Sequence, residues 1–549
     1  MPTAFSARIA PARPGPDDVR SRRWIYVPYD QLTAEVGPLA GADPATTGLV
    51  LVESREKARR RPYHKKKLAV LLSNMRHFAL EQAARGFKVL YLAGDGSFAE
   101  QLAAAVQREG LRELVVMRPA ERELRVDLEA AVGSGRLPLS VVDNALHLTA
   151  PADLRAAAPD GPPYRMDAFY RQVRRRLGVL MAGGKPVGGR FSFDGENRKA
   201  WPGEPAPPPR FSVPPDEITS EVLALVERTF PHAWGTLAGF DLPASAADAA
   251  ALWQHVTARC LPWFGPFEDA LSVEAPDLFH SKVSAVVNLG RLVPRRLVAD
   301  TEALYQEGAL PLPSAEGFIR QLLGWREFVR HVHEATDGFR TLEPGAAPSA
   351  LAAAEPLPAV FWGGAPSGLR CLDHVIERVH GEGYSHHITR LMVLSNLATL
   401  LGVSPRALCD WFWIAYVDAY DWVVEPNVLA MGTYGAGGLM TTKPYVSGAA
   451  YLHKMGDACD GCRFDPGGGA TACPITPMYW AFLDRNRERL APNERMKLPL
   501  ASAARRTPAQ RQGDHAVTER VRAALAAGRE IPADVVERAT RGPSLFDSG

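Results

Sequence analysis

Short apolar runs alternate with amphipathic stretches over the first quarter of the chain. Residues 64–86 and 97–110 place apolar positions at helical spacing, and each stretch ends at glycine. Strands that alternate with helices in this way predict a doubly wound α/β domain with a parallel sheet over residues 23–150. The predicted strands, which read as buried and parallel, are residues 24–29, 48–53, 88–94, 113–119 and 139–144.

The pattern changes after the α/β domain. Residues 151–217 become dense in Gly and Pro and predict an extended interdomain linker. Over residues 218–500 the strand pattern disappears and helical spacing dominates, which predicts a larger all-α domain. Residues 1–22 lack an apolar core and residues 501–549 are rich in Ala and Arg, so we expect flexible tails at both ends.

Composition fits a globular protein of more than one domain. The chain has 549 residues, of which 46% are hydrophobic and 23% charged, and this balance excludes a disordered protein. The net charge of +2 hides basic runs at 55–67 and 171–176, which form either a solvated face or a surface for an anionic partner. Since no stretch approaches 18 apolar residues and the N-terminal residues do not read as a signal peptide, we expect no membrane span and a cytoplasmic protein.

Three of the six cysteines lie within fifteen positions. Cys459 and Cys462 form a C-x-x-C pair, and Cys473 follows directly before a proline. The glycine-rich segment between them allows the chain to fold back, so that three thiolates can meet. Zinc bound by four thiolates and an iron–sulfur cluster both fit this spacing, and three unrelated buried thiols are the remaining alternative. The candidates for a fourth ligand are Cys260, Cys371 and Cys409.

The helical domain also carries polar residues that packing alone does not require. Ser281 and Ser284 lie at a predicted helix start, where they either cap the helix or hold a phosphate. Residues 320–330 and 383–392 place arginines beside a tryptophan and a histidine pair. Residues 409–422 concentrate Trp, Tyr and Asp, which indicates either core packing or a path for electrons.

Taken together, these motifs resemble the photolyase/cryptochrome family. Within it they are similar to the prokaryotic iron–sulfur branch, the deoxyribodipyrimidine photolyase-related proteins that include bacterial (6-4) photolyases. The resemblance covers about residues 48–490 and implies an antenna-type α/β domain followed by a helical FAD-binding domain. The segments that carry it are HKKKLAVLLSNMRHFA, PVGGRFSFDGENR, EGFIRQLLGWREFVR, YSHHITRLMVLSN, YVDAYDWVVEPNVLAM, TKPYVSGAAY and CDGCRFDPGGGATACPITPMYW.

The resemblance implies two cofactors in the helical domain. A [4Fe–4S] cluster would be held by Cys371, Cys459, Cys462 and Cys473, leaving Cys260 and Cys409 as packing residues. For FAD, the family implies Ser281 and Ser284 at the diphosphate and Arg326 beside the cofactor. It further implies that Arg390 and Asp418 pair near the isoalloxazine ring, with Asn427 on the N5 side.

The implied activity is light-driven repair of (6-4) photoproducts in ultraviolet-damaged DNA by a monomer. His387, with His386 beside it, matches the active-site histidine that moves a proton, and Tyr445 and Tyr451 match tyrosines near the lesion. Light-driven reduction of the flavin requires a relay of oxidisable aromatic residues. Trp411 and Trp362 are the expected members, and Phe412 stands where the branch often has tyrosine.

The N-terminal domain departs from the branch. Tyr29 replaces a glycine after the first strand, and Lys57 and Arg60 occupy positions where acidic and aromatic residues would embrace a lumazine. Asp30 and Glu53 remain as contacts. The alternatives are 6,7-dimethyl-8-ribityllumazine with altered contacts, another chromophore, or no antenna.

Three other interpretations of the whole chain stay open at this point. They are a cryptochrome-like blue-light photoreceptor, a cyclobutane dimer photolyase, and a zinc-stabilised nucleic-acid-binding protein without flavin. We also consider Asp194 and Glu196 as holders of a divalent ion near DNA.

Overall fold

A five-stranded parallel sheet forms the core of the N-terminal domain. The computed structural model describes residues 3–540 except 344 and 346. The strand order is β3-β2-β1-β4-β5, so the connections reverse direction beside β1, and the predicted parallel sheet is confirmed. Such a reversal opens a crevice at the carboxyl ends of the strands. The strands are β1 (Arg23–Tyr26), β2 (Thr47–Ser54), β3 (Lys88–Gly94), β4 (Leu114–Met117) and β5 (Leu139–Val142).

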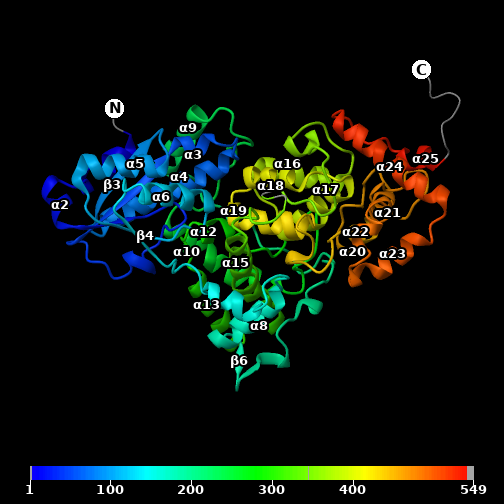
Figure 1. Cartoon of the computed structure of the whole chain (residues 1–549), viewed down its shortest axis with the longest axis horizontal. Helices are drawn as coiled ribbons and strands as arrows, with labels where there is room; N and C mark the ends of the chain where they lie inside the picture. Colours follow the sequence, from blue (N-terminus) through cyan, green and yellow to red (C-terminus); the bar gives the residue numbers. More distant parts are fainter. Residues whose placement is uncertain (1–2, 344, 346, 541–549) are drawn as a thin grey trace.

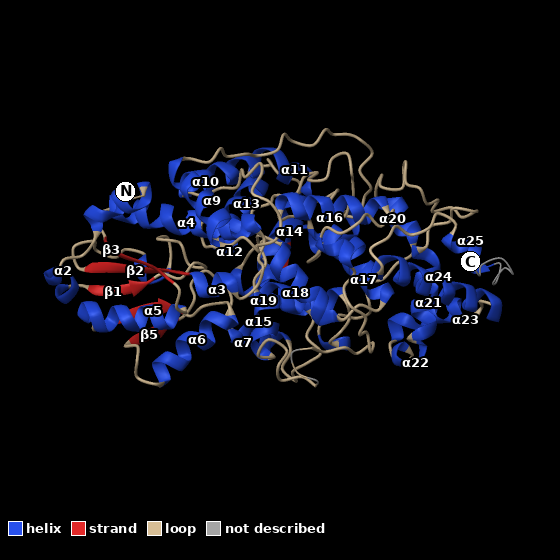
Figure 2. Ribbon diagram, turned by 90° about the horizontal axis from the view of Figure 1, so that it is seen from above, coloured by secondary structure: helices blue, strands red, loops and turns tan. Residues whose placement is uncertain are grey.

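Helices cover both faces of this sheet. Figure 2 shows α4 (Lys65–Ala84) on one side of the strands and α5 (Phe98–Ala105) and α6 (Arg122–Gly133) on the other. In the same view α2 (Pro16–Ser21) and α3 (Arg55–Arg59) lie at opposite ends of the strands. β5 differs from the prediction of a buried strand, because it is an edge strand whose last three residues are exposed.

Residues 3–22 are not a flexible tail, contrary to the expectation for residues 1–22, whose first two residues lie outside the described range. They form α1 (Ala4–Ile9) and α2 (Pro16–Ser21), which pack against the domain. Phe5 is buried with its ring centroid 4.6 Å from that of Tyr91, and Val19 is buried as well. Ile9 also packs against the core, so scattered apolar side chains hold the segment although they form no recognisable core in the sequence.

The C-terminal segment is likewise packed over the part that the structure describes. α24 (Pro508–Ala526) lies against α21 (Ile475–Arg485) and buries Val517, Val521 and Leu525 at helical spacing. The expectation of a tail over 501–549 is thus wrong for α24, and residues 541–549 lie outside the described range.

The rest of the chain is mainly helical, as predicted, and forms the larger part of the molecule (Figure 1). Residues 151–217, expected to be extended, begin with α7 and α8, continue through the short strands β6 (Met181–Ala182) and β7 (Lys185–Pro186), and become irregular beyond residue 197. In the described part of the chain, no helix is long and apolar enough to cross a bilayer. The remaining helices are α7 (Pro151–Ala157), α8 (Met166–Leu177), α9 (Glu217–Thr229), α10 (Ala246–His255), α11 (Leu261–Phe264), α12 (Ser284–Asn288), α13 (Pro294–Gln306), α14 (Leu312–Ile319), α15 (Glu327–Ala335), α16 (Arg370–Glu382), α17 (Asn396–Leu401), α18 (Pro405–Ala415), α19 (Asp421–Val424), α20 (Ala449–Met455), α22 (Arg487–Leu490), α23 (Lys497–Ala504) and α25 (Val535–Thr540).

Besides η6 (Val256–Cys260), three further π-helical segments interrupt helices of this domain. They are η7 (Arg320–Arg326), η9 (Thr389–Ser395) and η10 (Glu425–Gly432), and each contains a residue predicted to lie at the flavin. Because π-helical turns occur frequently at functional sites, their placement is consistent with a site among these helices.

Candidate functional site

A buried ion pair lies at the centre of the helical domain. Arg390, from η9, donates through both terminal nitrogens to the carboxylate of Asp418, at 3.1 and 2.9 Å. Burial opposes the charge on Asp418, but the guanidinium outweighs it and lowers the pKa of that carboxyl group. The pair therefore stays ionised and fixes a positive charge inside the domain.

Ser284 belongs to this pair. Its hydroxyl donates to Asp418 at 2.7 Å, and the side chain of Asn288 donates to the backbone carbonyl of the same residue at 2.9 Å. Ser284, which was predicted to contact the diphosphate, thus uses its hydroxyl proton in the hydrogen bond to the Asp418 carboxylate. Ser281 precedes α12 and makes no hydrogen bond of this kind to Asp418 in the described structure.

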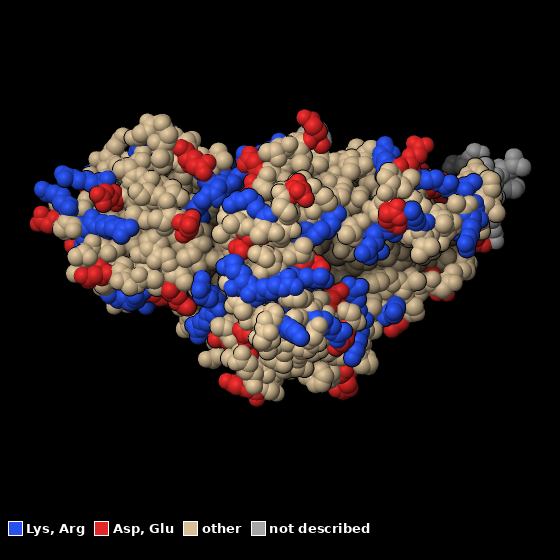
Figure 3. Space-filling view, turned by 60° about the horizontal axis from the view of Figure 1, so that its bottom comes forward, with Lys and Arg blue, Asp and Glu red and all other residues tan. Residues whose placement is uncertain are grey.

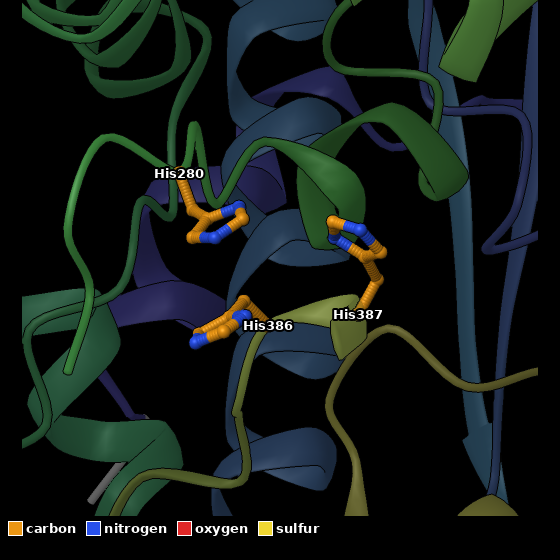
Figure 4. A group of neighbouring side chains, drawn as sticks. All are labelled: His280, His386 and His387. Atoms are coloured by element: carbon orange, nitrogen blue, oxygen red, sulfur yellow. The ribbon is translucent and has the colours of Figure 1, made fainter. Parts of the chain in front are cut away.

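Three histidines gather beside the ion pair. Figure 4 shows His280, His386 and His387 facing one another from two loop segments, and their ligand nitrogens lie within 4.8 Å of one another. The rings of His280 and His386 stack, with centroids 4.1 Å apart and an interplanar angle of 10°. Parallel stacked rings direct their in-plane lone pairs alongside each other, so they do not converge on one metal ion.

The two stacked histidines are neutral. Burial lowers the pKa of His280 to about 3, and it lowers the pKa of His386 well below the usual value. Both ring nitrogens of His386 and Nε2 of His280 are buried without a hydrogen-bond partner among the described residues. Because each orphaned polar group costs roughly 1–3 kcal/mol, this arrangement is suited to a bound ligand that supplies the missing partners.

His387 faces a more open and more charged environment. Its side chain is 47% exposed, and Nε2 lies 3.5 Å from Oδ1 of Asp269. Asp269 in turn lies 3.7 Å from Nε of Arg198. Burial, helped by the charge of Asp269, raises the pKa of Tyr451 to about 12, and burial also raises the pKa of Tyr445.

Arg198 and Asp269 therefore place charged groups beside the residues that are predicted to face the lesion. Neither residue is predicted in this role from the sequence. Arg198 ends the segment FDGENR, whose acidic residues were considered as holders of a divalent ion. Asp269 belongs to no motif. Their role arises only from tertiary contacts.

The acidic residues of that segment do not form an open cation site. Asp194 pairs with Arg198 and lies 3.1 Å from Arg320, and Glu196 pairs with Arg190. Since arginines already neutralise both carboxylates, the structure gives no support to the divalent-ion hypothesis.

The four cysteines that the resemblance implied as ligands lie near one another. Cys371 lies in the first turn of α16, and the glycine-rich loop folds back so that the N–H groups of Cys473 and Asp465 donate to Asp465 and Thr471, both at 2.8 Å. Burial raises the pKa of the Cys371 thiol, and Cys473, Cys462 and Cys459 are close enough to raise it further. Cys260 and Cys409 are buried elsewhere as packing residues.

The four thiols are less tightly gathered than the ligands of a single tetrahedral zinc ion. Tetrahedral zinc with Zn–S bonds of about 2.3 Å requires sulfur atoms about 3.8 Å apart. Among the described residues, however, no three cysteine sulfurs lie within 4.8 Å of one another. A polynuclear iron–sulfur centre separates its ligands more widely than one ion does.

Arg326 and Asn427 make contacts away from the Arg390–Asp418 pair. Arg326 lies 3.0 Å from Nδ1 of His147 and 3.1 Å from Glu327, in a buried network that joins the end of the α/β domain to α15. The side chain of Asn427 donates to the backbone carbonyl of Val423 at 2.8 Å.

A largely apolar pocket lies at the carboxyl ends of the strands, in the crevice expected from the strand order. Tyr29 and Glu121 line it, and the Tyr29 hydroxyl, Oδ1 of Asp30 and Oε2 of Glu121 are buried without a partner among the described residues. Burial raises the pKa of Asp30 to about 6. The unpartnered atoms on the two lining residues, Tyr29 and Glu121, suit a ligand with polar edges.

The two basic residues that stand at the expected antenna positions are paired rather than free. Lys57 binds Glu121 and Glu123, at 3.0 and 2.5 Å, and Arg60 binds Glu56 at 2.8 Å. Glu53 accepts hydrogen bonds from Arg76 at 2.8 Å and from the Tyr91 hydroxyl at 2.5 Å, so its carboxylate already binds residues of the α/β domain.

One face of the molecule carries a band of basic side chains. Figure 3 shows Lys and Arg gathered across its middle, beside a hollow, with few acidic groups between them. A band of this kind attracts a polyanion such as the DNA backbone.

Comparison with known proteins gives a consistent result. Residues 25–242 match the family model described as deoxyribodipyrimidine photo-lyase-related protein. The chain is 36% identical over 489 residues to a protein named (6-4) photolyase from Agrobacterium fabrum, covering 88% of this chain and 95% of the relative.

Two solved structures share the fold. The first is a bacterial class III photolyase from Agrobacterium tumefaciens (TM-score 0.54, 15% identity, 89% of this chain and 93% of that one). The second is the cryptochrome of Synechocystis sp. PCC6803 (TM-score 0.52, 16% identity, 75% of this chain and 82% of that one). The chain therefore belongs to the photolyase/cryptochrome family, among the deoxyribodipyrimidine photo-lyase-related proteins.

Proposed function

We propose that this protein is a light-driven (6-4) photolyase that acts as a monomer on ultraviolet-damaged DNA in the cytoplasm. The observation that carries the proposal is the partly exposed His387 beside Asp269, set directly against a buried neutral histidine pair and the Arg390–Asp418 ion pair. The full-length similarity to a named (6-4) photolyase supports it.

FAD fits the centre of the helical domain. The unpartnered nitrogens of His386 and His280 supply polar contacts, and Arg390 supplies a fixed positive charge that would favour a reduced, anionic flavin. When bound, FAD supplies the light-excited electron for repair. Ser281, Arg326 and Asn427 remain our proposed contacts for other parts of the cofactor.

The chain's own residues then bind and orient the lesion. The basic band holds the DNA backbone, and the damaged bases leave the stack to enter the site. We assign Tyr445 and Tyr451 to positioning the lesion, because burial raises the pKa of both phenols and they keep their protons.

Proton transfer falls to His387 rather than His386. The pKa of His386 lies far below neutrality, so that ring cannot carry a proton at pH 7. His387 is open to the lesion, and Asp269 is placed to orient its ring through Nε2. Asp269 therefore acts as a positioning residue, and His387 as the group that donates a proton to the lesion and recovers it.

We further propose a [4Fe–4S] cluster on Cys371, Cys459, Cys462 and Cys473. It would tie α16 to the loop before α21 and so serve as a structural centre. The crevice beside Tyr29 is our proposed site for an antenna chromophore of the lumazine class, whose polar ring edge would satisfy the orphaned atoms there.

The test is conversion of a (6-4) photoproduct in an oligonucleotide by the purified protein with reduced FAD. We expect conversion under blue light and none in the dark. Absence of conversion in the light would contradict the proposal and would favour a photoreceptor role.

A further inference from the structure

A third tryptophan lies between the two that we expected to carry electrons. The ring centroid of Trp234 is 6.4 Å from that of Trp411 and 6.2 Å from that of Trp362. Trp411 is fully buried and Trp362 is 38% exposed. The three indoles thus form a continuous row from the interior of the helical domain to its surface.

The inner end of this row adjoins the proposed flavin site. The centroid of Trp411 is 5.9 Å from that of Tyr416, and the guanidinium of Arg390 lies 4.1 Å over the Tyr416 ring. Phe412, also next to Trp411, is buried in the core and stacks on Tyr416 at 5.2 Å. Because phenylalanine is too hard to oxidise, it cannot continue the path.

We propose that Trp234 is the middle member of a Trp411–Trp234–Trp362 relay that reduces the flavin in the light. The inference rests on the proposed function, since it requires bound FAD. Trp234 would carry the electron-transfer step that Phe412 cannot perform. Trp234 belongs to the segment between α9 and α10, far from Trp411 and Trp362 in sequence.

The electrons balance along the row. Trp411 donates one electron to the photoexcited oxidised flavin, Trp234 donates one to the Trp411 cation, and Trp362 donates one to the Trp234 cation. Trp362, at the surface, releases its indole proton to water. A soluble thiol then returns one electron and one proton to Trp362.

Hydrogen bonding keeps the inner two members protonated. The indole N–H of Trp411 donates to the carbonyl of Phe361 at 2.7 Å, and that of Trp234 donates to the carbonyl of Trp362 at 3.1 Å. A backbone carbonyl is not a base, so neither cation loses its proton there. Each inner step is therefore the transfer of an electron alone.

Charges near the rings favour this row over its neighbours. The guanidinium of Arg61 lies 3.9 Å from the Trp413 ring centroid and Lys57 lies 5.8 Å from it, and like charges make a cation on Trp413 unfavourable. Arg390 has the same effect on Tyr416. In the described part of the chain, no Lys or Arg lies over the rings of the three relay tryptophans.

Of the two histidines packed on Trp234, His64 does not oppose a positive charge either. His64 lies edge-on at 5.4 Å and His380 at 5.2 Å. Burial lowers the pKa of His64 to about 4, so this ring is neutral at pH 7 and does not repel the cation.

The test compares Trp→Phe variants of FAD-loaded protein. Blue light and dithiothreitol drive flavin reduction, followed by flavin absorbance, and transient absorption follows the tryptophan radical. We expect Trp234→Phe and Trp362→Phe to slow photoreduction about tenfold or more and to abolish the long-lived radical. Trp234→Tyr keeps an oxidisable ring and should retain part of the rate.

The matched control is Trp253→Phe. Trp253 is buried, stacks on Phe318 at 5.6 Å and donates to Asp300 at 2.8 Å, away from the row. It should photoreduce at the wild-type rate. A wild-type rate in Trp234→Phe, or a larger loss in Trp413→Phe, would overturn the relay.

A separate measurement distinguishes this inference from the proposed function. Trp234→Phe reduced chemically with dithionite should repair a (6-4) photoproduct as fast as the wild type. Failure of the chemically reduced wild type to repair contradicts the proposed function, whereas the photoreduction rates still decide the relay.

Discussion

His387 and His386 are neighbours in sequence, but their surroundings give them different chemistry. His386 is buried against His280 and stays neutral, whereas His387 reaches a charged, open surface beside Asp269. The sequence predicts the pair through its motif but not this division, because the division depends on His280 and Asp269, which come from distant segments.

At the scale of single residues, the first prediction concerns proton transfer. His387→Ala should lower the rate of (6-4) repair about 100-fold or more, because a general acid–base residue usually contributes a factor of this size. Flavin absorbance should stay unchanged. His453→Ala, at an exposed histidine on α20, is the control and should repair normally. Undiminished repair by His387→Ala would remove this residue from the mechanism.

The second prediction concerns the buried ion pair. Asp418→Asn leaves the Arg390 charge without its partner and should cost about 3–5 kcal/mol of unfolding free energy, with loss of FAD during purification. Asp95→Asn removes the partner of Arg59 on the surface and should cost less than about 1 kcal/mol. Urea unfolding of the two variants measures the difference, and equal losses would contradict the structural role of Asp418.

At the scale of elements, the cysteine loop was the most predictable part of the site. The C-x-x-C pair, the glycines and Cys473 lie within one short segment, so local sequence contains most of the geometry. The relay was far less predictable. Trp234 reaches Trp411 and Trp362 only because the segment after α9 packs against α16 and α18.

The third prediction follows from the cluster. Cys371→Ser should abolish the broad visible absorption of an iron–sulfur centre and lower bound iron, because one of four ligands is lost. Cys260→Ser, a buried thiol outside the group, should keep full iron content. Iron content equal to the wild type in Cys371→Ser would contradict the assignment.

His64, the N-cap of α4, links the two domains. Its N–H donates to Ile414 at 2.9 Å, and its ring contacts the carbonyl of His380 at 3.0 Å. Burial lowers the folded-state pKa to about 4, whereas the unfolded value is about 6.5. Between these values the unfolded chain binds a proton that the folded chain does not, so stability falls as pH falls from 6.5 to 4.

The fourth prediction is that this group contributes up to about 3 kcal/mol of acid destabilisation over that range. His64→Gln should be less stable at pH 7.5 but should show a shallower loss between pH 6.5 and 5 in urea unfolding. An unchanged slope would contradict the role of His64 in the acid response.

At the scale of the whole molecule, both the two-domain architecture and the parallel sheet could be predicted from hydrophobic periodicity. The termini could not, because scattered apolar side chains such as Phe5 hold α1, and α24 is held by its packing on α21. The basic band in Figure 3 depends on how distant segments meet at the surface, and the net charge of +2 conceals it.

The fifth prediction belongs to this surface. DNA affinity should fall steeply between 50 and 200 mM salt, by about tenfold or more, since binding releases counterions from several phosphates. Fluorescence anisotropy with an undamaged duplex measures this non-specific component. Affinity independent of salt would show that the band does not bind the DNA backbone.

The most direct test of the account is photorepair by protein with fully reduced FAD, given two oligonucleotides under blue light. One carries a (6-4) photoproduct and the other a cyclobutane dimer. We predict conversion of the (6-4) photoproduct alone, and its loss in His387→Ala. Conversion of the cyclobutane dimer alone, or of neither lesion, would contradict the proposed function.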